Sequence, residues 1–86
     1  MGPIRLLIVD DSLLIRTFLR DLFQAEPDFE LIGAAADPYQ ARDLMRHTWP
    51  DVITLDVEMP KMNGIEFLRK VMGARPTPVV MLSTLT

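Results

Sequence analysis

Hydrophobic residues follow two different spacings along the chain. Continuous short runs are typical of buried strands, and apolar residues three or four positions apart are typical of helices. The continuous runs predict four strands: Ile4 to Val9, Leu31 to Ala35, Val52 to Leu55 and Val79 to Leu82. The first run is broken only by Arg5, as expected for a strand that is buried on both faces, and the second run predicts a weaker strand.

Helical spacing fills the three intervals between the predicted strands. The first helix begins after Ser12, a good N-cap, the second begins at Asp37-Pro38 and continues to about Thr48, and the third begins at Asn63-Gly64. The apolar positions are Ile15, Phe18, Leu19, Leu22 and Phe23 in the first helix, Ala41, Leu44 and Met45 facing inward in the second, and Ile65, Leu68, Val71 and Met72 facing inward in the third.

Strands that alternate with helices predict an α/β fold with a doubly wound parallel sheet and right-handed crossovers. We adopt the flavodoxin-like strand order, which gives 2-1-3-4 for four strands and makes the first and third strands neighbours. At 86 residues the chain is one small domain, residues 1–86, with room for one modest core.

Composition excludes several classes of function. The net charge is −3 with no Lys/Arg block, so nucleic acid is not an expected partner. The absence of cysteine excludes disulfides and thiolate metal sites. No apolar run is long enough to span a bilayer, and the N-terminus reads as a strand rather than a signal peptide. We expect a cytoplasmic protein without a membrane partner.

Three carboxylates follow the predicted neighbouring strands. Asp10 and Asp11 end the first strand and Asp56 ends the third. A single acid at a strand end is usually just solvated, but three together repel one another unless a proton or cation intervenes. Oxygen ligands that leave room for water suit Mg²⁺, with Mn²⁺ as a substitute. Such a site suits phosphoryl transfer to a carboxylate, with Asp56 as the nucleophile and the Ser83 hydroxyl hydrogen-bonded to a phosphoryl oxygen.

Three stretches carry a family resemblance. "LLIVDDS", "DVITLDVEMPKMNGIEFL" and "PVVMLSTLT" resemble the receiver domain of two-component response regulators. The "DP…ARDLM" and "DVEMP.M.G" stretches are similar to the amino-terminal receiver of the chemotaxis protein-glutamate methylesterase. The likeness covers essentially the whole chain.

The resemblance implies specific roles and partners. Asp56 matches the phosphorylated aspartate, Asp10 and Asp11 match the acidic metal pair, Glu58 stands where a backbone carbonyl binds the metal, and Ser83 matches the switch hydroxyl. In that family a histidine kinase, here of the chemotaxis type, donates the phosphoryl group. Phosphorylation then regulates the methylesterase domain attached to the receiver.

The chain also departs from the family pattern. Receivers continue with a fourth helix, a fifth strand that ends in a lysine, and a fifth helix, and this sequence stops before them. We therefore expect a truncated receiver that is phosphorylated slowly, has no methylesterase activity and self-associates, as a dimer or higher oligomer, through the edge of strand 79–82. No Gly-x-Ser-x-Gly occurs, and His47 is interpreted as an ordinary helix-surface residue. Lys61 is interpreted as a solvated charge rather than a substitute for the lysine.

Two alternative interpretations stay open. The first is an isolated half-flavodoxin fragment that self-associates and has no signalling activity. The second is a haloacid-dehalogenase-like phosphatase, but such an enzyme needs Asp-x-Asp-Thr near the first strand, whereas the acids there are adjacent and Asp56-Val57-Glu58-Met59 does not fit.

Three further residues are interpreted as structural. Pro60 constrains a loop, Gly64 relieves crowding at a helix start, and Trp49 covers the end of the second helix.

Overall fold

The fold is a parallel sheet with helices on both faces, as the sequence predicts. The computed structural model describes residues 2–57 and 64–82. Its elements are β1 (Ile4–Val9), α1 (Leu13–Gln24), β2 (Phe29–Ala35), α2 (Pro38–His47), β3 (Val52–Asp56), α3 (Gly64–Ala74) and β4 (Val79–Leu82). All strand pairs are parallel, and the order is β2-β1-β3-β4. The predicted fold class and strand order are confirmed.

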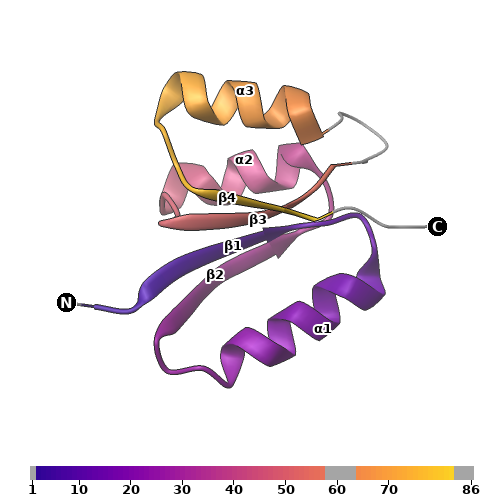
Figure 1. The fold of residues 1–86 in the computed structure, drawn as a ribbon, viewed down its shortest axis with the longest axis vertical. Coiled ribbons are helices and arrows are strands. Elements are labelled where there is room, and N and C mark those ends of the chain that lie inside the picture. Colours follow the sequence, from indigo (N-terminus) through magenta and orange to yellow (C-terminus); the bar gives the residue numbers. More distant parts are fainter. Residues whose placement is uncertain (1, 58–63, 83–86) are drawn as a thin grey trace.

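The helices form two layers. Helix α1 covers one face of the sheet, whereas α2 and α3 lie together on the other (Figure 1). Two predicted N-caps fix where helices begin: the Ser12 hydroxyl accepts a 3.3 Å hydrogen bond from the Ile15 amide, and the Asp37 carboxylate accepts one of 2.9 Å from each of the Tyr39 and Gln40 amides. Such caps satisfy amide groups that the first helical turn leaves without partners.

The main core lies between the sheet and the pair α2 and α3. Its members are Leu7, Val9, Ala35, Ala41, Met45, Ile53, Leu55, Phe67 and Val71. The inward stripe predicted for the second helix is confirmed, since Ala41 and Met45 are buried and Leu44 packs against the core.

The stripe predicted for the third helix is partly wrong. Ile65 and Met72 are 43% and 38% exposed, whereas Phe67 is only 5% exposed. The buried positions of α3 are Gly64, Phe67 and Val71, three and four residues apart. Sequence spacing allowed both stripes, and the buried one places the largest apolar side chain of the helix in the core and the glycine against the end of β3.

Helix α1 has helical apolar spacing, but its apolar residues are not buried. Leu14, Phe18 and Leu22 are 77%, 62% and 48% exposed. The Phe23 ring meets the Phe29 ring of β2 edge to face, with 4.9 Å between centroids. This contact fastens the end of α1 to the first residue of β2, which begins two residues earlier than the predicted Leu31.

Strand β4 is an edge strand of the sheet. It pairs with β3, and within residues 2–57 and 64–82 no strand pairs with its other side. Val80 and Met81 are 52% and 40% exposed. Self-association through this edge stays a prediction.

An ion pair fastens the starts of β1 and β3. The Arg5 guanidinium donates hydrogen bonds of 3.2 Å to both carboxylate oxygens of Asp51, and the Arg5 amide donates another of 2.9 Å. The Asp51 amide in turn donates to the Arg5 carbonyl at 2.8 Å. The hydrogen bonds from the Arg5 side chain, followed by the one from its amide, lower the pKa of Asp51.

We expect Asp51→Asn to lower stability only where the carboxylate is ionised. Because the pKa of Asp51 is lower in the folded than in the unfolded chain, its contribution is fully present above the unfolded value of about 4 and is lost as the pH falls through the lower folded value. Urea unfolding at a series of pH values tests this. The gap between variant and wild type should be present at neutral pH and shrink below about pH 4.

The matched control for that experiment is Asp43→Asn. Asp43 forms an exposed pair with Arg46 on α2, with 3.5 Å between the charged atoms. Such a pair contributes little, so this variant should unfold like the wild type at every pH. A gap for Asp51→Asn that is the same at low and neutral pH would contradict the proposed role of the ion pair.

Candidate functional site

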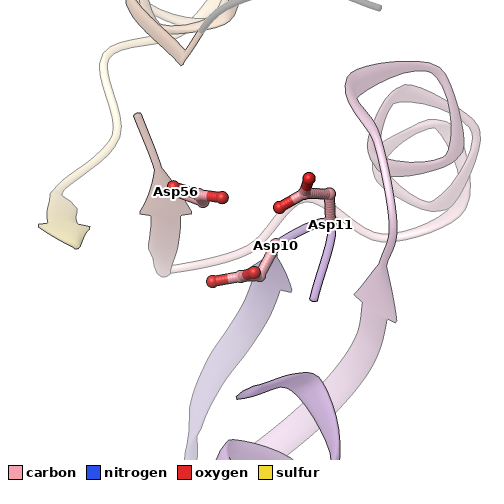
Figure 2. Close-up of side chains that lie close together, drawn as sticks. All are labelled: Asp10, Asp11 and Asp56. Carbon is pink, nitrogen blue, oxygen red and sulfur yellow. The ribbon is translucent and has the colours of Figure 1, made fainter. Parts of the chain in front are cut away.

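Three carboxylates meet at the carboxyl edge of the sheet. Val9 of β1 pairs with Leu55 of β3, so the next residue of each strand, Asp10 and Asp56, lies at the same edge. Asp11 follows Asp10, and oxygen atoms of all three carboxylates lie within 4.8 Å of one another. Figure 2 shows the side chains of Asp11 and Asp56 reaching toward each other above Asp10. The structure thus brings together the three acids singled out in the sequence.

Two of these carboxylates are buried. Asp10 and Asp56 are only 6% and 7% exposed, whereas Asp11 is exposed. Removing an ionised carboxylate from water costs several kcal/mol unless hydrogen bonds or opposite charge compensate. Two buried acids beside a third are therefore unfavourable unless a cation or hydrogen bonds offset their charge.

Ser12 and Arg16 position Asp10. One carboxylate oxygen of Asp10 accepts a 2.8 Å hydrogen bond from the Ser12 amide, and its carbonyl accepts one of 2.7 Å from the Arg16 guanidinium. Sequence reasoning found Ser12 as a helix cap but missed both contacts with Asp10. The signal for the first was local, because Asp side chains often bind the amide two residues ahead. Arg16 stands six residues after Asp10, on the turn of α1 next to the strand end, and only the fold brings the two together.

The donor set fits a hard divalent cation. All three acids offer carboxylate oxygen, which Mg²⁺ and Mn²⁺ prefer over nitrogen or sulfur ligands. Oxygen atoms of the three carboxylates lie within 4.8 Å of one another, a spacing that suits ligands gathered around one small cation. Asp11 is exposed, which leaves this side of the cluster accessible to an ion and its water.

Gly64 lets α3 begin directly against the end of β3. Its amide donates a 2.7 Å hydrogen bond to the Val57 carbonyl. A Cβ atom there would lie 2.6 Å from the Asp56 carbonyl oxygen and 2.8 Å from the Val57 Cα, both backbone atoms that cannot rotate away. The interpretation of Gly64 as a relief of crowding is confirmed, and the crowded partner is the backbone of the site itself.

Other residues from the sequence analysis have plainer positions. His47 is exposed on α2, as predicted, and Trp49 is half-buried and donates a 2.7 Å hydrogen bond from its indole Nε1 to the Thr77 hydroxyl. Glu58, Pro60, Lys61 and Ser83 lie outside the described residues, so their roles stay predictions. No helix within the described part of the chain is long and apolar enough to cross a membrane.

Comparison with known families identifies the family to which the fold belongs. The family model described as the response regulator receiver domain matches residues 6–86. The chain belongs to the receiver domain family. The resemblance seen in the sequence is confirmed, whereas the roles that it implies for Asp10, Asp11 and Asp56 stay predictions.

Individual relatives agree with this membership. A protein-glutamate methylesterase/protein-glutamine glutaminase of Nitrosomonas europaea is 60% identical over the whole chain, which spans 24% of that protein. The response regulator domain of Thermotoga maritima CheB is 45% identical with a TM-score of 0.88, over 98% of this chain and 63% of that one. A CheX–CheY–BeF₃–Mg²⁺ complex from Borrelia burgdorferi contains a chain that is 37% identical with a TM-score of 0.87, over 98% and 64%. The receiver thus spans about a quarter of the length of the methylesterases it matches.

We expect Mn²⁺ to bind at the acidic cluster, with affinity that depends on Asp11. Nuclear relaxation should show saturable broadening of the amide signals around residues 10–12 and 56–57, and Asp11→Asn should weaken binding by at least about tenfold. Trp49 is a poor reporter, since it precedes β3 at the opposite edge of the sheet. Asp43→Asn, on the exposed surface of α2, is the control, and equal titration curves for all three proteins would contradict the site.

We also expect Gly64→Ala to be destabilising and to perturb the site. The added methyl group meets the backbone of Asp56 and Val57, and such overpacking typically costs about 1–3 kcal/mol. Gly73→Ala in the same helix is the matched control, because nothing lies within 4 Å of the position that its methyl group would take, and the better helix former should add about 0.5–1 kcal/mol. Urea unfolding measures both. Equal stability of the two variants would show that the close approach at Gly64 carries no strain.

Proposed function

We propose that the receiver is the phosphoacceptor module of a chemotaxis two-component system and that Asp56 accepts the phosphoryl group. The observation that carries this proposal is the position of Asp56. It is a buried carboxylate at the end of a central strand, held within 4.8 Å of two further acids from the neighbouring strand end. Acids gathered this closely repel one another, and a bound cation turns that repulsion into attraction for a phosphoryl group.

The reaction transfers a phosphoryl group to a carboxylate oxygen of Asp56. The donor atom is an oxygen in acetyl phosphate and a nitrogen in a phosphohistidine. A carboxylate oxygen of Asp56 attacks the donor phosphorus in line, the bond from phosphorus to the donor atom breaks, and its electron pair leaves with the donor. The product is an acyl phosphate on Asp56. Mg²⁺ bound by Asp10 and Asp11 would supply positive charge that offsets the charge on the phosphoryl oxygens.

The protein holds the carboxylates of Asp10 and Asp56 in place and largely away from water. β3 fixes the backbone of Asp56 in the sheet, and the Gly64 amide ties Val57, the next residue, to the start of α3. The Ser12 amide and the Arg16 guanidinium fix Asp10 from the other side. Catalysis of phosphoryl transfer depends mainly on positioning and electrostatics, and these contacts support the positioning of Asp10 and Asp56. In the same proposal the Glu58 carbonyl would hold the metal and the Ser83 hydroxyl would donate a hydrogen bond to a phosphoryl oxygen.

The partners follow from the family and its relatives. The donor is a histidine kinase of the chemotaxis type, and the regulated element is a methylesterase domain, since the relatives are methylesterases about four times as long as this chain. The structure of a similar chain with Mg²⁺ and BeF₃ supports Mg²⁺ as the cation. Membership of the receiver family gives no support to the haloacid-dehalogenase alternative or to an idle half-flavodoxin.

Treatment with acetyl phosphate and Mg²⁺, followed by intact-mass spectrometry, tests the proposal. We expect one added phosphoryl group on the wild type and on Asp43→Asn, and none on Asp56→Asn or when Mg²⁺ is chelated. Asp11→Asn should slow the modification by at least about tenfold, in step with its weaker metal binding. Modification that persists in Asp56→Asn, or that proceeds equally without divalent metal, would assign the phosphoryl group to another residue.

A further inference from the structure

A groove lies between α2 and α3, away from the acidic cluster. Its volume is about 240 Å³, and its lining comes from both helices and from Trp49 just beyond α2. The floor consists of Met45, Phe67 and Val71, which are 6%, 5% and 4% exposed. Both helices lie on the same face of the sheet (Figure 1). It is therefore an apolar depression that reaches the protein core.

The rim of this groove is basic, although the chain as a whole is acidic. Its basic residues are Arg42, Arg46 and Lys70, and the part of its lining that the structure describes contains no acidic residue. The net charge of the chain is −3, so this concentration of cations runs against the overall balance. Arg46 also pairs with Asp43, which lies outside the groove, at 3.5 Å between exposed atoms. A weak pair of this kind is readily exchanged for a stronger carboxylate partner.

Aromatic side chains complete the walls. Tyr39 is 41% exposed, and the Arg42 guanidinium lies 5.5 Å from its ring centroid. Trp49 is half-buried against the core, and the Arg75 guanidinium lies 5.9 Å from its ring centroid. Tyrosine, tryptophan and arginine are the residues that dominate binding energy in protein interfaces. Here they surround one apolar depression.

We infer that this groove binds an acidic amphipathic helix of a partner protein, which inserts an apolar side chain between α2 and α3 and places its carboxylates on Arg42, Arg46 and Lys70. A groove between two helices suits a helix that presents apolar residues at positions i, i+3 and i+4. A flat anionic membrane fits less well, because the apolar floor is recessed and buried. The basic rim favours a partner with negative charge. The recessed apolar floor favours a partner that inserts an apolar side chain.

A synthetic helical peptide with Phe and Leu on one face and Glu elsewhere is the probe. Trp49, the single tryptophan, and the amide signals of α2 and α3 report binding. We expect saturable changes confined to these two helices and a decrease in affinity with added salt. The double variant Arg42→Glu/Arg46→Glu should bind at least about tenfold more weakly, because like charges then face each other. Ala74→Leu, which narrows the groove without changing charge, should also weaken binding.

Several controls make the outcome decisive. Arg69→Glu reverses a charge on α3 that does not line the groove, and it should bind like the wild type. Groove variants should retain Mn²⁺ binding at the acidic cluster, which shows that they are folded. The inference is overturned if the acidic peptide gives no saturable change, if a peptide with Lys in place of Glu binds equally, or if Arg69→Glu weakens binding as much as the double variant. Binding to anionic but not neutral lipid vesicles, lost in the double variant, would assign the groove to a membrane instead.

Discussion

The parallel pairing of β1 with β3 is the constraint on which both the fold and the site depend. Its register pairs Leu6 with Val52 and Val9 with Leu55, so a slip of a single residue would turn every core side chain of a strand to the opposite face. The same register places Asp10 and Asp56 at one edge and the Arg5–Asp51 ion pair at the other. The apolar residues between the two ends are buried on both faces of the sheet. The charged residues therefore lie at the two ends of a largely buried strand pair.

The site draws on stability that the rest of the fold provides. Two buried carboxylates next to a third acid are unfavourable for an isolated chain, and the contacts around Asp10 offset part of this cost: an amide for its carboxylate and a guanidinium for its carbonyl. Gly64 contributes by having no side chain, which allows α3 to begin against the backbone of Asp56. A chain selected for stability alone would replace the buried acids with apolar residues. Their presence in the centre of a well-packed sheet is the physical argument for a cation-dependent function.

The sequence predicted the elements and the cluster more successfully than the contacts. Apolar spacing, the Ser12 and Asp37 caps and the Asn63-Gly64 turn located the strands and helices of residues 2–57 and 64–82, because burial and capping act over a few neighbouring residues. Convergence of Asp10, Asp11 and Asp56 required only strand order. The buried face of α3 was misjudged, since Ile65 and Phe67 are equally apolar and only the packing against β3 and α2 distinguishes them. The contact of Arg16 with Asp10 was missed because it depends on how α1 lies along the sheet, which spacing does not determine.

Opposite charges are separated on this small domain, and that separation has consequences for how partners approach. The carboxyl edge carries the acidic cluster, whereas the described lining of the groove between α2 and α3 holds three cations and no acid. Screening by salt limits each field to roughly 8 Å at physiological ionic strength, so an approaching segment responds to the region it faces and not to the net charge. In the proposed function, an anionic phosphoryl donor would approach the acidic edge through a bound divalent cation, which offsets two of the three negative charges there. An acidic helix is repelled from that edge when no cation is bound and attracted to the groove in either case. The acidic cluster and the groove therefore differ in one respect: an anionic partner needs a bound metal to be attracted to the cluster but not to the groove.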